Sequence, residues 1–583
     1  METTKARKRN TMGKLNGIML TLAMIAVFCG TASADTLTVC SSGCDYTKIQ
    51  DAVNNAAVGD TIFVYNGSYT ENVDVSKELT LQGEGADVVT VTAASPDDYV
   101  FEVTGNYVNI SGFTATGTIG PYIYKAGICL INASHCNISD NIASNNYYGI
   151  GVGSSNNNTL TNNNASDNKF GGIGLGSSNS NTLQNNTANS NNYYGIDLTC
   201  SSGNMLQGNM MSGNRWNFGV VADSLSHYTQ NIDTSNTVDG KTVYYWVDQK
   251  DKQIPDDAGY VGIVNCTNIT VKDLTLTNNT QGVLFAYTEN SRIENVSASN
   301  NDVGIYMESS DSNTLESNTA NSNGIRGICL ERSSSNTLQR NNASNNEQRG
   351  IDLFCDSSNN MLQSNTVNSN DYFGIVIGPW SCCNTLQSNT ASNNRYGIWL
   401  SSSSNTLTKN TVNSNDYGTY LSGANNNNIT CNWVHNNTNP GFYLTTDYWG
   451  DGSTNNNISY NNIIENGGYY EYQFYNDQTD DVDAANNWWG TTDRDIINVS
   501  IHDWNDDPSK GNVTYLPILN DPAPCAQIPD ETPTFTTTDA VIALQIAVGS
   551  REYDPLYDVS GDDRITSLDV LMILQAATGA IRL

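Results

Sequence analysis

The residues whose types and spacing best suit chemistry lie near the C-terminus, between Asp558 and Asp569. Oxygen-bearing side chains stand at positions 1, 3, 5, 9 and 12 of this stretch, and position 7 offers a backbone carbonyl, which is the ligand spacing of a calcium loop. The predicted ligands are Asp558, Ser560, Asp562, Arg564 through its carbonyl, Thr566 and Asp569. The alternative is an acidic surface turn. Position 6 carries Asp563 in place of glycine, and Asp partly tolerates the positive φ required there.

The pattern around this loop occurs twice, since residues 535–549 repeat the pattern of 565–579. This duplicated loop and helix resembles a type I dockerin over residues 526–583. The resemblance implies calcium-dependent folding, a cohesin-like partner and four contact positions: Thr537, Thr538, Ser567 and Leu568. Ile528 replaces the first Asp of the earlier loop, so one site is expected to be vestigial. The alternative is a tail that calcium stabilises without any cohesin-like partner.

Charged residues crowd three consecutive units of an internal repeat in the middle of the chain. The candidate catalytic patch is Glu308, Glu331, Arg332 and Asp352, with Arg326 and Arg349 close by. Paired carboxylates on neighbouring strands can act as acid and base across a glycosidic bond. The competing interpretation is a solvated charged face. The patch alone therefore identifies no catalytic residue.

Aromatic residues recur beside the Gly-Ile pairs of the repeat. The candidates for carbohydrate binding are Tyr148, Tyr194, Phe373, Tyr396 and Trp399. Aromatic faces can stack on sugar rings, and they can equally stack on one another along a rod. Stacking on a sugar and stacking on neighbouring rings both require aromatic side chains at the spacing of adjacent strands.

These residues must be positioned by the repeat itself, whose unit is 21 to 24 residues long. Leu, Ala and Ile fall in short alternating stretches between Asn, Ser and Gly, which is strand rhythm. No unit can fold alone, so the units must stack, and the predicted fold is an all-β, single-stranded parallel β-helix of roughly 16 coils about 4.8 Å apart. Two Asn columns should pair up the stack and close its turns: Asn163, Asn186, Asn318, Asn341, Asn365, Asn389 and Asn410, and Asn168, Asn191, Asn323, Asn346, Asn370, Asn394 and Asn415.

The repeat gives the predicted boundaries. The β-helix is expected over residues 35–505, with an N-terminal capping helix within 46–57 that covers the first coil. At 223–262 the rhythm stops, and a strand pair projecting from the rod is predicted there. Six prolines between 508 and 533 indicate a stiff linker at 506–525, followed by a small α-helical calcium module at 526–583.

Three stretches resemble known families. Residues 238–246 (VDGKTVYYW) and 258–271 (AGYVGIVNCTNITV) resemble the NosD family of right-handed β-helix proteins, and 46–53 (YTKIQDAV) resembles the opening of the pectate-lyase-like superfamily. The first resemblance implies a right-handed helix and an association with copper-centre assembly. The four His residues lie far apart, so no transition-metal cluster is expected, and copper is not an expected cofactor.

Composition and the N-terminus indicate an exported protein. Basic residues, an apolar run and Ala32-Ser33-Ala34 predict a signal peptide over residues 1–34, after which no transmembrane anchor is expected. A retained N-terminal anchor is the alternative. Disulfides are permitted outside the cell, and Cys40 and Cys44 could pair there. The net charge of -33 excludes nucleic acid as a partner.

The sequence therefore predicts a secreted or cell-surface scaffold, associated with polysaccharide or surface-layer glycans and tethered through its calcium-dependent tail. Its Asn-x-Ser/Thr sites would permit glycosylation. The alternative is a polysaccharide lyase, epimerase or hydrolase on the same rod. A copper-site maturation protein of the NosD kind is the second alternative.

Overall fold

The computed structural model describes residues 34–120, 125–468, 472–526, 537–551, 557, 559 and 564–577. The predicted signal peptide, apart from Ala34, and the loop ligands Asp558, Ser560 and Asp562 lie outside these ranges. Within the described residues, no helix has both the length and the apolar character needed to cross a membrane.

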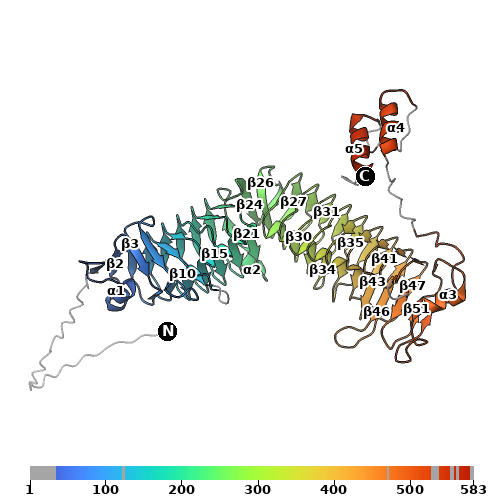
Figure 1. Cartoon of the computed structure of the whole chain (residues 1–583), viewed down its shortest axis with the longest axis horizontal. Coiled ribbons are helices and arrows are strands. Elements are labelled where there is room, and N and C mark those ends of the chain that lie inside the picture. Colours follow the sequence, from blue (N-terminus) through green and yellow to red (C-terminus); the bar gives the residue numbers. More distant parts are fainter. Residues whose placement is uncertain are drawn as a thin grey trace, which may run out of the picture.

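The chain winds into a parallel β-solenoid of about 20 turns (Figure 1). Strands of successive turns pair in parallel to form the walls. A nine-stranded sheet runs from β1 (Thr36–Val39) to β22 (Asn231–Ile232), and a seven-stranded sheet joins β4 (Val73–Val75) to β21 (Trp216–Val221). The predicted parallel β-helix is confirmed, with more turns than expected.

Asparagine side chains inside the solenoid join each turn to the next. The backbone N–H and side-chain amide of Asn186 both donate to Asn209 Oδ1 at 3.0 Å, and the amide also donates to the Leu160 carbonyl at 2.8 Å. The preceding residue, Asn185, has φ of 54°, which turns the chain sharply. Each ladder Asn therefore pairs buried polar groups of two neighbouring turns without water.

The two Asn columns predicted from the repeat are confirmed as buried hydrogen-bonded ladders. A third ladder was not expected. It consists of Asn158, Asn181 and Asn204 in the first half and of Asn313, Asn336, Asn360, Asn384, Asn405 and Asn427 in the second. Columns of Leu, Ile, Val and Ala fill the space between the ladders.

A short helix closes the first turn, as predicted. α1 (Ile49–Asn55) buries Ile49, Ala52 and Val53 against the end of the rod. The Glu71 carboxylate accepts the backbone N–H groups of Ile49 and Gln50 at 2.9 Å, at the positive end of the helix dipole. The disulfide Cys40–Cys44 forms beside this cap, which confirms the local pairing.

The rod bends at residues 223–262, which we call the elbow; it separates a first arm (34–222) from a second arm (263–526) (Figure 1). β23 (Thr237–Val238) extends the sheet of β20 (Met210–Ser212), and β24 (Lys241–Val247) turns back on β23 before pairing with β26 (Ala258–Val264). The expected projecting strand pair is therefore wrong, because these strands lie in the wall. The sheet that contains β20 and β23 therefore forms a different wall of the solenoid in the second arm from the one it forms in the first.

Contacts between the arms and within the elbow fix the bend. The Thr280 N–H donates to the Phe218 carbonyl at 3.0 Å, and the Phe218 ring lies edge-on to Tyr260 at 4.9 Å. The fully buried Tyr228 receives a hydrogen bond on its carbonyl from the Tyr245 hydroxyl at 2.5 Å. Buried aromatic packing of this kind fixes the bend.

The rod continues beyond residue 505. β52 (Val513–Thr514) pairs with β50 (Val482–Asp483), and the Ala523 N–H donates to Asn462 Oδ1 at 2.8 Å. A disulfide joins Cys525 to Cys431. The segment 506–525, expected to be a linker, is therefore part of the second arm.

The tail contains α4 (Thr537–Ala547) and α5 (Ser567–Ala577). The two helices bury a small core of Ala540, Ala543, Ile546, Tyr557, Ile565 and Ile573. This agrees with the small α-helical unit that the sequence predicts.

We expect Asn191→Ala to lower the free energy of unfolding by about 2–4 kcal/mol, because buried groups on Asn168 and Ala165 lose their partner. Asn192 is the matched control, since it is adjacent and exposed. Asn192→Ala should change stability by less than about 0.5 kcal/mol. Urea unfolding of both variants, followed by tryptophan fluorescence, measures the difference. Equal effects would contradict the stabilising role of the ladder.

Candidate functional site

The predicted charged patch lies on the second arm beside the elbow. Strands β30 (Val303–Glu308) and β32 (Arg326–Glu331) place Glu308 directly beside Glu331. Arg332 joins them, with Nε 2.8 Å from Glu308 and Nη2 3.0 Å from Glu331. The Tyr306 hydroxyl donates to Glu331 at 2.8 Å. Glu308 is fully buried, and burial raises its pKa.

Asp352, the fourth residue of the patch, is paired in the same way. It lies on β34 (Arg349–Phe354), fully buried between Arg326 at 2.8 Å and Arg349 at 2.7 Å. The structure thus brings the whole patch together on adjacent strands. Its carboxylates are largely occupied by arginines, and Glu308 and Asp352 are closed to solvent. This arrangement suits a structural ion cluster better than an acid and base awaiting a substrate.

Two aspartates near the elbow were missed by the sequence analysis. Asp197, on β18 (Tyr194–Thr199), has one buried oxygen without a hydrogen-bond partner among the described residues, and burial raises its pKa to about 7. Burial also raises the pKa of Asp302 to about 6, against the opposing effect of Arg215. Asp197 stands where the neighbouring strands carry Gly174 and Gly219. In the sequence, a single carboxylate at a repeat position that is glycine in the neighbouring units could have pointed to Asp197.

Asp197 belongs to the first arm and Asp302 to the second. Burial raises the pKa of Tyr194 to about 12, and the charges of Asp302 and Asp197 both add to this effect, so both lie near Tyr194. Arg215 pairs with Glu347 across the elbow at 3.1 Å. The sequence separation of the two arms concealed this arrangement.

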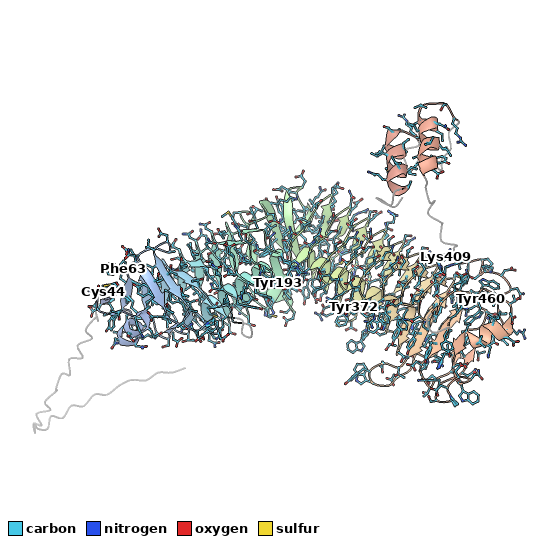
Figure 2. All side chains as sticks on the ribbon, in the orientation of Figure 1. Cys44, Phe63, Tyr193, Tyr372, Lys409 and Tyr460 are labelled. Atoms are coloured by element: carbon cyan, nitrogen blue, oxygen red, sulfur yellow. A yellow bond between two sulfur atoms is a disulfide. The ribbon has the colours of Figure 1, made fainter. Side chains whose placement is uncertain are left out.

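The predicted aromatic residues mostly contact one another. Phe373 stacks on Tyr396 at 5.1 Å, and Tyr396 stacks on Tyr417 at 5.2 Å. Tyr148 and Tyr194 both pack edge-on against Phe170 in the first arm. Figure 2 labels aromatic residues on both arms, among them Tyr193 on the first and Tyr372 on the second. These rings stiffen the outer faces of the rod.

Trp399 differs, because it lines an open groove of about 620 Å³ on the second arm. Trp380, Tyr448 and Trp449 line the same groove, with 67%, 93% and 73% of their surfaces exposed. Asp447 organises the loop by accepting the N–H groups of Trp449 and Asp451 at 2.9 Å. Large exposed aromatic surfaces of this kind mark binding sites.

The loop carrying Tyr448 and Trp449 left a signal that the sequence analysis missed. Successive ladder residues Asn405 and Asn427 are 22 positions apart, whereas Asn427 and Asn456 are 29 apart. The lengthened unit contains Asp447, Tyr448 and Trp449, which form part of the wall of the groove. The lengthened repeat therefore marks the binding loop.

In the tail, part of the predicted calcium loop is described. Asp569 is fully buried and accepts hydrogen bonds from the N–H and hydroxyl of Thr566 at 2.7 and 3.0 Å. Arg564 precedes them and is exposed. Of the predicted partner contacts, Ser567 and Leu568 are exposed at the start of α5, and Thr537 and Thr538 begin α4.

We expect Arg332→Met to lower the free energy of unfolding by about 2–3 kcal/mol at pH 8, because Glu308 keeps a buried charge without its main partner. The loss should shrink as pH falls. Glu308 has a raised pKa, so the folded state takes up a proton at higher pH than the unfolded state. Urea unfolding between pH 5 and pH 8 measures both effects.

Arg340→Met is the matched control for this substitution. Arg340 shares the left-handed backbone of Arg332 and pairs with Glu316 at the surface. A surface ion pair contributes about 0–1 kcal/mol, so this variant should stay close to the parent protein. Equal losses for the two arginines would contradict the importance of the buried pair.

Comparison with known proteins places the chain among β-helix families. A model described as "Right handed beta helix region" matches residues 259–412. A 136-residue segment is 32% identical to the "Cell surface glycoprotein" of Methanothermus fervidus, covering 23% of this chain and only 21% of that protein.

Solved structures give weaker similarity. The A-module of a mannuronan C-5 epimerase from Azotobacter vinelandii matches at 14% identity and a TM-score of 0.27, over 64% of this chain and 93% of the module. A pectate lyase matches at 14% identity and a TM-score of 0.29, over 57% of this chain and 77% of the lyase.

The model described as "Periplasmic copper-binding protein (NosD)" matches residues 53–253 and 354–515, which is more than half of the chain. These matched ranges lie in both arms of the solenoid and include most of the elbow. The chain therefore belongs to the NosD family of β-helix proteins.

Proposed function

We propose that the protein is an exported, cell-surface β-helix scaffold that binds glycan through the aromatic groove lined by Trp380, Trp399, Tyr448 and Trp449. The groove carries this proposal, because its large aromatic surfaces are open to solvent. The name of the surface glycoprotein relative, the predicted signal peptide and the disulfides Cys40–Cys44 and Cys431–Cys525 support an extracellular location.

The charge of the chain favours a neutral glycan. The net charge is -33, and Asp447 lies in the wall of the groove. An anionic polymer would be repelled unless cations intervened. The groove is therefore expected to select neutral polysaccharide over a uronate polymer.

The double variant Tyr448→Ala/Trp449→Ala should weaken binding of a neutral β-glucan about tenfold, because each lost stacking contact is worth about 0.5–1.5 kcal/mol. Affinity electrophoresis of the full chain in gels containing the polysaccharide measures the change. Trp504→Ala is the control, since Trp504 is exposed on the second arm but lies outside the groove lining. If the polysaccharide retards the double variant as strongly as the parent protein, the glycan site is refuted.

A polysaccharide lyase, epimerase or hydrolase is the second candidate function, favoured by Asp197 and Asp302. Both carboxyls have a pKa near neutrality, which suits general acid or base catalysis. The test is turnover of a polysaccharide panel with calcium present. Activity that Asp197→Asn abolishes would replace the scaffold by an enzyme.

We further propose that the tail is a calcium-dependent tether. The core between α4 and α5 is small, so the folding of the tail depends on a further contribution such as bound calcium. The buried Asp569 supplies a carboxylate at the last position of the ligand pattern. A cohesin-like partner would bind the faces that bear Thr537, Thr538, Ser567 and Leu568.

Removal of calcium should expose the tail to protease while the solenoid stays intact. Limited trypsin digestion of the full chain, with calcium or with a chelator, shows this directly. Asp558→Ala should be cleaved in the tail even with calcium, whereas Asp563→Asn should be protected, since position 6 supplies no side-chain ligand. A digestion pattern unaffected by chelator would refute the calcium site.

A further inference from the structure

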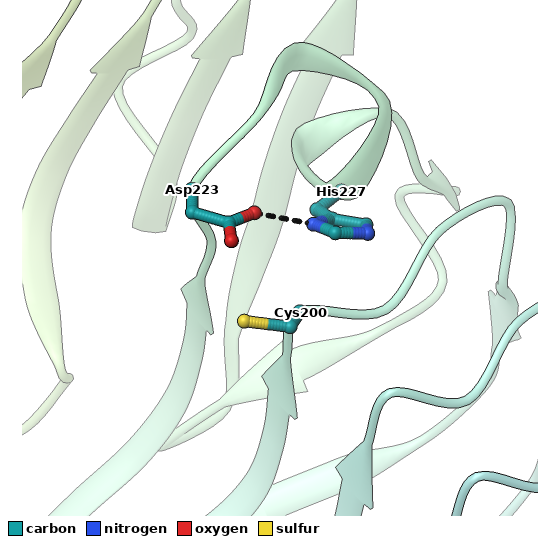
Figure 3. Close-up of side chains that lie close together, drawn as sticks. All are labelled: Cys200, Asp223 and His227. Atoms are coloured by element: carbon teal, nitrogen blue, oxygen red, sulfur yellow. Dashed lines mark hydrogen bonds and ion pairs between the residues drawn. The ribbon is translucent and has the colours of Figure 1, made fainter.

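Three side chains of metal-ligating type meet at the start of the elbow, away from the aromatic groove. The ligand atoms of Cys200, Asp223 and His227 all lie within 4.8 Å of one another (Figure 3). Asp223 Oδ1 lies 2.6 Å from His227 Nδ1. Within the described parts of the chain, this is the one group of three or more His, Cys, Asp or Glu donors at such distances.

The backbone holds these donors in place. The Cys200 N–H donates to the Val221 carbonyl at 2.9 Å, which ties the end of β18 to the end of β21, two residues before Asp223. His227 lies on α2 (Leu225–Tyr228). The fully buried Tyr228 anchors this helix, and its hydroxyl donates to the Ala222 carbonyl at 3.0 Å. A preformed donor set lowers the cost of binding an ion.

The turn itself does not require a cysteine. Asn132, Ser154 and Ser177 precede Cys200 in the same column of turns, and all four residues have φ of about 50°. Cys200 lies in the coil next to the place where α2 interrupts the repeat. The interruption supplies both other donors, Asp223 and His227.

From this geometry we propose that Cys200, Asp223 and His227 bind a thiophilic transition-metal ion, with Zn²⁺ as the ion that the donor set fits best. Thiolate, imidazole and carboxylate are the ligands of tetrahedral zinc, and three protein ligands leave a fourth position open. Bonds of about 2.0–2.3 Å place such ligand atoms about 3.3–3.8 Å apart, so the donors need only small side-chain rotations. On binding, Cys200 releases its thiol proton and His227 carries its proton on Nε2.

The orientation of the imidazole argues against a cysteine nucleophile. In such a catalytic group one ring nitrogen faces the thiol and the other faces the carboxylate. Here Nδ1 faces Asp223, and Figure 3 shows Nε2 turned away from Cys200. The sulfur and the second oxygen of Asp223 lie on the Nδ1 side of the ring, where one ion can contact all three donors.

Cobalt titration of the full chain tests this proposal. The variant background Cys382→Ser/Cys383→Ser removes the adjacent thiols, which are 3.0 Å apart. We expect one equivalent of Co²⁺ to produce a thiolate-to-cobalt charge-transfer band that Zn²⁺ then abolishes. Cys200→Ser should remove the band. His227→Ala should weaken Co²⁺ binding about 100-fold, because loss of a direct ligand should cost at least as much as the ~10–100-fold that loss of a residue supporting a ligand costs.

Cys355→Ser is the matched control, because Cys355 occupies the corresponding turn column in the second arm, also with positive φ. This variant should keep the band. No band in the parent protein, or a band that survives Cys200→Ser, would overturn the proposal. Displacement of Co²⁺ by Ca²⁺ or Mg²⁺ at equal concentration would overturn it too, since these ions prefer oxygen ligands.

Discussion

The asparagine ladder is the interaction on which the rest of the molecule depends. A solenoid turn of 21 to 24 residues bends sharply several times, and each bend leaves backbone groups that cannot pair within the sheets. Asn186 and its counterparts pair these groups inside the rod, where water does not reach them. Because ladders and apolar columns occupy the interior, recognition and chemistry are left to outward-facing residues and to loops that interrupt the repeat.

Each candidate site arises where the repeat departs from this rule. The elbow replaces a regular coil by α2 and the four strands from β22 to β25 (Lys250–Gln253), and it brings Asp223 and His227 close to Cys200. The coil after Asn427 gains residues that form one side of the aromatic groove. In contrast, the charges of Glu308 and Asp352 lie on regular strands and are neutralised by their neighbours. Regular coils therefore provide the rod, and irregular ones provide the binding surfaces.

Periodicity made the regular parts of the fold predictable from the sequence. Leu and Asn recur in successive units at the positions of Leu183 and Asn186, and this recurrence was sufficient to predict the parallel strands and two ladders. The apolar face of 46–57 was sufficient to predict the capping helix. Local patterns could not predict contacts between distant units. The pairing of Cys431 with Cys525 spans 94 residues. The Arg215–Glu347 ion pair spans 132 residues and forms across the bend of the rod. The strands at 223–262 were misplaced because their pattern fits a projecting hairpin as well as a wall.

If the rod presents its aromatic groove to a neutral glycan, a crystal structure of the chain with a neutral β-glucan oligosaccharide will show sugar rings stacked on Trp449 and Tyr448. The elbow will be free of sugar. Sugar bound beside Asp197 or Asp302, with the groove empty, would contradict glycan binding in the groove.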